Sequence, residues 1–398
     1  MFVDLCFFAG VGGSNGELWK RQRRFTVSTF RNLGLGKSSF EELIVTECKE
    51  LVNYLKRLRI DDGQSFNPKS VFPLATANMI CSFAFGRRYD YSNEEYKFVL
   101  HSIQKIDRLY KEIGGAQMFL PFFKYLPTKR NRELHESTKV WIEFIGNIVT
   151  EHEAEFNPDC PNDYIDIYLK EIQTFTDDLL TLGNLRASVA GLFFAGHGTT
   201  ANTMRWAIYC MLKFPDIQMA VQTELDAVVG PDRLPTLADK AHLPYTEATL
   251  LEIQRYGSTA RFGIGHTAAE DTELFGYTIL KGSYLLPNLW AVHHDPTLWH
   301  NPEEFQPTRF LNDERAVETP QEFIPFGIGM SLVIQMYLFR TINYVKIIPR
   351  TFHIKLCKFI TPASVAQLIY NLSTNLGRRT SHLSCYIGYV RHKSTTTQ

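Results

Sequence analysis

Apolar and polar residues recur with a helical period along most of the first 256 residues. Apolar positions spaced three and four apart predict amphipathic or buried helices. Val71–Phe85 is nearly all apolar or small, which predicts a buried helix, and we expect Pro73 in its first turn, where proline is tolerated. The helices that this pattern predicts run over Glu17–Phe30, Phe40–Leu58, Val71–Phe85, Glu133–Phe156, Thr176–Phe214 and Pro244–Tyr256.

The ends of two of these helices carry specific signals. Asp177 and Asp178 come near the start of the longest one, where negative charge suits the helix dipole, and Pro215 closes it. Gly257 comes just after the end of the last predicted helix, where a residue with positive φ is common.

The pattern changes after residue 257. Ser258–Ala291 reads as short strands with turns, and a Pro-rich loop follows from Asp295 to Phe310. The fold class is therefore mainly α with a small β portion, an α+β arrangement.

Charge divides the chain. It has 398 residues, and 42 Lys+Arg balance 42 Asp+Glu, which argues against a nucleic-acid partner. From Ser331 to Gln398, however, nine Lys or Arg residues occur without any Asp or Glu, so residues 1–330 carry a balance of −9. We therefore expect three parts: a divergent N-terminal stub over residues 1–13, a helical body over residues 14–329, and an unrelated, poorly ordered basic tail over residues 330–398.

Cysteine usage and hydropathy bear on the compartment. The seven Cys residues are scattered without a CxxC pair, which favours a reducing, intracellular setting. Met1–Gly10 is apolar but too short to cross a bilayer and is interrupted by Asp4, so no transmembrane segment is predicted.

Four local patterns could carry chemistry. Glu252 and Arg255 are spaced i, i+3, so they can pair on one helix face, although most such pairs are solvated. Arg309, in the Pro-braced loop, could reach back to Glu252 with bidentate geometry and pin the loop to the helix. Ala195–Thr200 places two Gly residues inside the longest helix, which calls for a bulky group against the backbone or for close helix packing. An apolar loop punctuated by Gly runs over Phe323–Gly329.

The order and spacing of these patterns resemble a microsomal cytochrome P-450 monooxygenase of the animal drug- and fatty-acid-oxidising type. The resemblance covers about Ser14 to Gly329 and implies an incomplete cytochrome P-450 fold with haem as cofactor. It also implies a lipophilic substrate, an NADPH-dependent reductase as electron donor, and the endoplasmic reticulum membrane as location. The family normally begins with a membrane anchor and a β-sheet before the first motif, so we expect the chain to be truncated at both ends.

The same resemblance assigns roles to individual residues. Trp19 and Arg23 match the Trp-x-x-x-Arg motif that contacts the haem propionates, and an indole N–H and a guanidinium one turn apart can both donate to carboxylates. His266 stands where the family has a propionate-binding His. Ala195 and Gly196 belong to the oxygen-binding groove. The resemblance further makes Thr199 the catalytic alcohol, and Glu252, Arg255 and Arg309 the structural ion-pair set.

Two positions depart from the family. The loop that should supply the axial thiolate opens correctly at Phe326, but Val333 occupies the Cys position, and valine cannot bind iron. Cys357 and Cys385 lack the surrounding Gly pattern, so neither is expected to replace it. Gly198 stands where the family has an acid, so proton delivery beside Thr199 would depend on water. His293, His294 and His300 could suggest a metal cluster, but the family explains that stretch, and no metal site is predicted.

Three interpretations of the function follow. One is an active haem-thiolate monooxygenase that inserts one oxygen atom from O2 into a fatty acid or xenobiotic. The favoured one is a catalytically dead fragment or pseudoenzyme with at most a binding role, because of Val333. The third is a helical interaction module whose basic tail adheres to acidic surfaces. Separately, the chain could contact a membrane surface, although no anchor is predicted.

Overall fold

The computed structural model describes residues 10–34, 38–58, 66–119, 122, 125–174 and 178–327. The N-terminal residues 1–9, Asp177, and the tail with Val333 therefore lie outside the described residues. The described helices are α2 (Gly10–Gly13), α3 (Gly16–Asn32), α4 (Ser38–Arg57), α5 (Pro68–Ala84), α6 (Glu94–Phe119), α7 (Lys129–Glu155), α8 (Tyr164–Thr174), α9 (Leu182–Lys213), α10 (Pro215–Val228), α11 (Pro244–Gly257) and α12 (Leu289–His293), with 3-10 turns η3 (Leu237–His242) and η4 (Pro307–Phe310).

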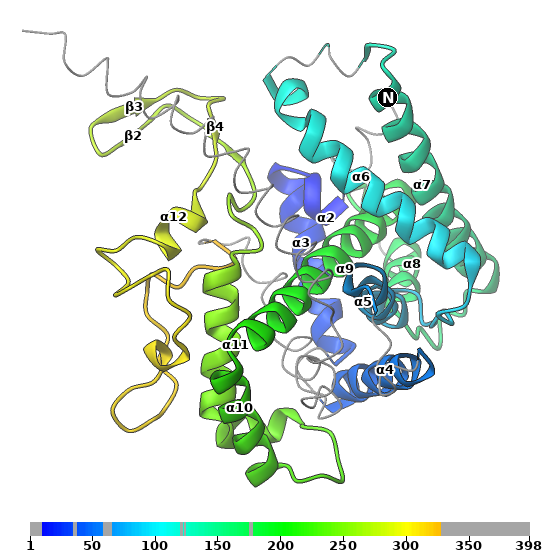
Figure 1. Cartoon of the computed structure of the whole chain (residues 1–398). Coiled ribbons are helices and arrows are strands. Elements are labelled where there is room, and N and C mark those ends of the chain that lie inside the picture. Colours follow the sequence, from blue (N-terminus) through cyan, green and yellow to red (C-terminus); the bar gives the residue numbers. More distant parts are fainter. Residues whose placement is uncertain are drawn as a thin grey trace, which may run out of the picture.

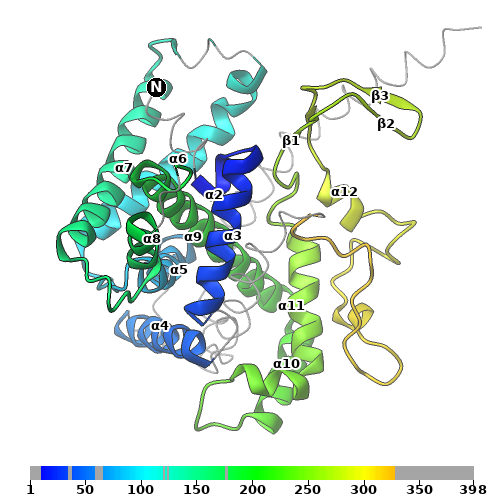
Figure 2. The ribbon, with the colours of Figure 1, turned by 180° about the vertical axis from the view of Figure 1, so that it is seen from behind.

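Helix α9 crosses the middle of the helical body (Figure 1). It packs against α2, α5, α7 and α8 along its length and against α10 and α11 toward its C-terminal end. The view from behind places α3 beside α8 and α9, and α11 beside the C-terminal end of α9 (Figure 2). This central position explains why α9 is apolar on most sides rather than along one stripe.

Helix α5 is buried, as predicted, but the expected place of Pro73 was wrong. The helix begins at Pro68, because the side chain of Asn67 accepts a hydrogen bond from the Lys69 amide (3.0 Å) and proline suits the first helical position. Pro73 therefore lies in the second turn, where its ring removes one backbone donor from the helix.

Helix α9 starts six residues later than predicted. The Oγ1 of Thr181 caps it by accepting a hydrogen bond from the Asn184 amide (3.1 Å). Asp178 lies near the start of α9, as predicted, but in a turn before this cap, so no acidic residue occupies the first helical turn.

Helix α11 ends one residue beyond the prediction. Gly257 belongs to the helix, and Ser258 takes the left-handed conformation with φ of 37°. A Cβ on Gly257 would lie 2.8 Å from the Trp206 ring, so close packing against α9 explains the glycine.

The β portion consists of two antiparallel pairs. β1 (His266–Thr267) pairs with β4 (Tyr284–Leu285), and β2 (Thr272–Leu274) pairs with β3 (Tyr277–Ile279), with Leu274 opposite Tyr277. The predicted α+β character is confirmed. Five helices, α2, α6, α8, α10 and α12, were missed by the sequence prediction, and α12 includes residues 289–291, which were predicted to belong to the strand region.

The main core lies between α3, α4, α5, α6, α7, α8 and α9 and is rich in aromatic rings. Phe30 and Phe40 both make edge-on contacts with Phe83, at centroid distances of 4.7 and 5.3 Å. In the part of the chain that the structure describes, no helix is both long and apolar enough to cross a bilayer.

Candidate functional site

The middle of α9 carries an exposed strip on an otherwise buried helix. Ala195, Gly198 and Thr199 are exposed, whereas their neighbours His197 and Thr200 are buried. A central helix that leaves small residues uncovered halfway along its length offers a flat backbone surface to a bound molecule.

The two glycines of this stretch serve different purposes. A Cβ on Gly196 would lie 2.5 Å from Cδ1 of Ile80 on α5, so this glycine permits close packing of α5 against α9. A Cβ on Gly198 would meet nothing within 4 Å. Of the two explanations that the sequence allowed, helix packing accounts for Gly196, and open space lies beside Gly198.

The side chains of Thr199 and His197 bond to their own helix. The hydroxyl of Thr199 donates to the Ala195 carbonyl (2.8 Å), a common arrangement for a helical threonine. The Nδ1 of His197 bonds to the Phe193 carbonyl (2.9 Å), and burial lowers the pKa of this imidazole. His197 is therefore a buried core residue whose Nδ1 is engaged by its own helix, and it does not form part of the exposed strip.

Trp19 and Arg23 form a second cluster on α3. Both are half-buried, and the Arg23 guanidinium lies 5.6 Å from the centroid of the Trp19 ring. They sit one turn apart, so their N–H groups emerge on the same side of the helix. His266 lies on β1 instead. Its ring is exposed, and its Nδ1 contacts the Ile264 carbonyl (2.8 Å), an acceptor, so Nδ1 carries the proton.

Glu252 and Arg255 form a fully buried ion pair. Nε and Nη2 of Arg255 donate to the two carboxylate oxygens of Glu252, at 2.7 and 2.8 Å. Arg255 also donates to the His293 carbonyl (2.8 Å) and the Glu304 carbonyl (3.2 Å). The pair is thus buried beneath the segment that contains His293 and Glu304, and it is not a solvated surface pair.

Arg309 joins this ion pair from η4, but in a different way from the prediction. Its Nε donates to one oxygen of Glu252 (3.2 Å), whereas the bidentate partner of that carboxylate is Arg255. The Nη groups of Arg309 bond to the carbonyls of His300, Asn301 and Glu304. Arg309 therefore contacts α11 through its bond to Glu252, and it braces the Pro-rich loop internally through the loop's own backbone carbonyls.

His293 extends the ion-pair set toward the Gly-punctuated loop. It is fully buried, and burial together with the nearby His294 and Arg255 lowers its pKa to about 3. Its Nε2 accepts a hydrogen bond from the Ile324 amide (3.0 Å), so Nδ1 carries the proton and faces the Ser258 hydroxyl (3.3 Å). The adjacent His294 bonds through Nδ1 to the Trp290 carbonyl (3.0 Å). His293, which the sequence could suggest as a metal ligand, instead makes this positioning contact, which its sequence context does not predict.

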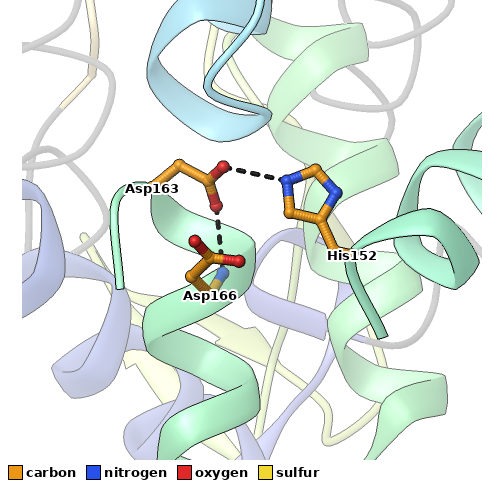
Figure 3. Close-up of side chains that lie close together, drawn as sticks. All are labelled: His152, Asp163 and Asp166. Carbon is orange, nitrogen blue, oxygen red and sulfur yellow. Dashed lines mark hydrogen bonds and ion pairs between the residues drawn. The ribbon is translucent and has the colours of Figure 1, made fainter. Parts of the chain in front are cut away.

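One further polar cluster joins α7 to α8 and was not found from the sequence. His152, Asp163 and Asp166 place ligand atoms within 4.8 Å of one another (Figure 3). The Nε2 of His152 bonds to Asp163 (2.9 Å), its Nδ1 bonds to the Ile148 carbonyl (2.9 Å), and Asp163 also accepts from the Asp166 amide (3.0 Å). The atoms that could bind a metal are thus already engaged in hydrogen bonds. The cluster caps the start of α8, and Asp163 favours the charged form of His152.

The described residues fit a flat cofactor with carboxylate side arms, as the resemblance to haem proteins requires. Trp19 and Arg23 offer donors for carboxylates, and the uncovered backbone at Gly198 leaves room beside α9. The position expected to hold the axial ligand, Val333, lies outside the described residues.

Comparisons with known proteins agree with this reading. A sequence profile described as "Cytochrome P450" matches residues 9–330. The chain is 39% identical to cytochrome P450 2U1 of Rattus norvegicus over 328 residues, which cover 79% of this chain and 60% of the relative. It is 37% identical to cytochrome P450 2B19 of Mus musculus, over 80% of this chain and 65% of the relative. The chain thus spans less than two thirds of the length of these relatives. Members of this family are haem-dependent monooxygenases, and the chain belongs to the cytochrome P450 family.

Proposed function

We propose that residues 14–329 form the haem- and oxygen-facing body of a monooxygenase that acts on a lipophilic small molecule. We also propose that a chain with this sequence has no catalytic activity. The exposed strip on α9 beside Gly198 carries the first part of the proposal. The valine at position 333 carries the second part.

The roles of the described residues follow from their donors and their exposure. When bound, haem supplies the redox centre that activates dioxygen. Trp19 and Arg23, with His266 from β1, would hold its two carboxylates, because an indole N–H, a guanidinium and an imidazole N–H can all donate to carboxylates. By the family motif, Ala195 and Gly196 belong to the oxygen-binding groove; of the two, Ala195 is exposed, whereas Gly196 packs against Ile80 of α5.

Thr199 is the proposed hydroxyl on the oxygen side. Its exposed Oγ1 can accept a hydrogen bond from water while it donates to the Ala195 carbonyl. Because the preceding residue is Gly198, which has no acid to relay a proton, water beside Thr199 is the proton carrier in this proposal.

The ion-pair set positions the loop that leads to the axial ligand. Glu252, Arg255 and Arg309 bind the backbone of residues 293–306, and His293 binds the Ile324 amide. These contacts fix the chain nine residues before position 333. The set therefore has a structural role in cofactor binding.

Three of the four described cysteines are too buried to offer a replacement thiolate, and the fourth, Cys160, is exposed in the turn between α7 and α8. Cys48, Cys81 and Cys210 are buried in the hydrophobic core, and burial raises the pKa of the Cys81 and Cys210 thiols. Cys357 and Cys385 lie outside the described residues. With Val333 at the ligand position, the proposed state of the chain is a haem-binding protein without thiolate ligation.

By the same family resemblance, an NADPH-dependent reductase is the proposed electron donor, and the surface of the endoplasmic reticulum membrane is the proposed location. Both proposals concern the whole length of the family's proteins, because the relatives are longer than this chain.

The test is a carbon monoxide difference spectrum of the reduced, haem-supplemented chain. We expect haem uptake without a thiolate-type Soret band. A thiolate-type band would contradict the inactive state, and a chain that takes up no haem would contradict the cofactor assignment.

A designed ligand sharpens this test. We expect Val333→Cys alone not to restore turnover, because Ser331 and Gln335 also replace the Arg and Gly of the family's loop. Val317→Cys, which adds a thiol at an exposed position in the described part of the chain, is the matched control. Turnover by Val333→Cys and not by Val317→Cys would show that the ligand alone was missing.

A further inference from the structure

A buried glutamine lies between the two residues assigned to the haem carboxylates. Gln22 is 0% exposed, although its neighbours on α3, Arg21 and Arg23, are partly exposed. A fully buried primary amide is costly unless its donors and acceptors are bonded. The contacts of Gln22 therefore show what the residue does in the fold.

The amide of Gln22 joins α3 to two other helices. Its Nε2 lies 2.7 Å from the Tyr168 hydroxyl on α8 and donates to the Leu179 carbonyl (2.8 Å), just before α9. Its Oε1 accepts from Tyr168 (2.9 Å) and from Ser188 on α9 (3.4 Å). Ser188 in turn accepts from the Val11 amide of α2 (3.1 Å). Three helices thus meet at this one side chain, and Ser188 links α2 to them.

The contact with α8 continues on both sides of Gln22. Arg21 pairs with Glu171 (2.8 Å), and Thr26 is hydrogen-bonded to Tyr164 (3.0 Å). The three partners on α8, which are Tyr164, Tyr168 and Glu171, are spaced four and three residues apart and so share one face. This row of polar contacts sets both the rotation of α3 about its axis and its position along α8.

Trp19 and Arg23 lie within one turn of Gln22 on the same hydrogen-bonded helix. Since an α-helix is stiff over one turn, fixing the rotation at Gln22 fixes the direction in which both side chains leave α3. We propose that Gln22 and Tyr168 are positioning residues for Trp19 and Arg23, and that α8 determines how these two donors face the haem carboxylates. This inference rests on the proposed function of Trp19 and Arg23.

The positioning effect is tested first without any ligand. The whole chain is labelled with 5-fluorotryptophan, and the 19F resonance of Trp19 is assigned among the five tryptophans with Trp19→Phe. In Gln22→Leu and Tyr168→Phe, we expect the Trp19 resonance to shift or broaden while those of Trp141 and Trp206 stay unchanged. Tyr277→Phe, which removes an exposed hydroxyl on β3, is the matched control and should leave Trp19 unchanged.

Tyr168→Phe removes a single oxygen atom and keeps the ring contact with Phe25, so it keeps the test decisive if Gln22→Leu does not fold. An unchanged Trp19 resonance in the folded Tyr168→Phe chain would overturn the inference. A general loss of dispersion in all five resonances of both variants would also overturn it, because the contacts would then support the whole fold and not α3 alone.

The second readout is the preference for haemin over haemin dimethyl ester, whose carboxylates are blocked. We expect the wild-type chain to prefer haemin on the order of tenfold, the value of one charge-assisted hydrogen bond. Gln22→Leu should lose most of this preference, and should lose nothing further when Arg23→Ala is already present. A wild-type chain without preference would contradict the proposed function of Trp19 and Arg23, whereas a preference that survives in Gln22→Leu would contradict the positioning role.

Discussion

The Nε2 atom of His293 accepts a hydrogen bond from the backbone amide of Ile324, 31 residues further along the chain. The imidazole is buried and neutral, and its other nitrogen faces Ser258 at the end of α11. One side chain thus connects the end of the ion-pair helix to the segment that approaches position 333.

This contact predicts a local effect of His293 substitution. We expect His293→Leu to leave the Ile324 amide without its acceptor and to cost about 1–3 kcal/mol of unfolding free energy. Hydrogen exchange should accelerate at residues 323–327 more than in α9. His300→Gln, at an exposed position, is the control, and equal exchange at residues 323–327 in both variants would contradict the positioning role of His293.

The buried carboxylate of Glu252 predicts unequal roles for its two arginines. We expect Arg255→Leu to cost about 3–5 kcal/mol, because it leaves a buried charge without its bidentate partner. Arg309→Leu should cost less, since Arg255 and the Gln306 amide still bind Glu252. Urea unfolding measures both. Lys97→Ala, which breaks an exposed pair with Glu94, should cost less than about 1 kcal/mol, and a similar loss for Arg255→Leu would refute the prediction.

The two glycines of α9 predict opposite responses to alanine. In Gly196→Ala the new methyl group meets Ile80, and we expect a loss of about 1–3 kcal/mol that Ile80→Val partly restores. In Gly198→Ala the methyl group points into open space, and we expect a gain of roughly 0.5–1 kcal/mol from better helix propensity. Thermal unfolding of the chain without haem distinguishes them, and equal melting temperatures would contradict the assignment.

The pair of His152 and Asp163 predicts a stability that depends on pH. Burial opposes the charged imidazole, but the hydrogen bond and charge of Asp163 outweigh it and raise the pKa of His152. Below the unfolded value of about 6.5, both states carry the proton and the stabilisation is complete. As the pH rises through the folded pKa, the unfolded state has already lost its proton, and the stabilisation is lost. We expect urea midpoints to fall over this range in the wild type and to fall less in His152→Gln, with exposed His135→Gln as the control.

Much of the fold follows from the sequence because apolar residues recur at helical spacing in the amphipathic helices and form long apolar stretches in the buried ones. Helix α6 was missed, although it is long, and it continues through Gly114 and Gly115, a pair that normally disfavours a helix. Helix α10 was missed because Pro215 signals both the end of one helix and the first residue of the next.

The candidate site was predicted in part. Spacing alone indicated that Glu252 and Arg255 share a helix face, but their burial depends on residues 293–310, which cover them only in the folded chain. The polar row around Gln22 could not be predicted, because a glutamine on a helix rich in Arg and Lys looks like a solvated residue. Its partners Tyr168 and Ser188 lie 146 and 166 residues away.

The separation of Glu252 from its partners also sets an order of assembly. Arg255 lies one turn away, so this pair forms together with α11 while both charges are still hydrated. Arg309 lies 57 residues further on and reaches the carboxylate only after the intervening chain has closed into a loop. We therefore expect the acidic group to enter the dry interior already neutralised, and residues 293–310 to join this region after α11 has formed.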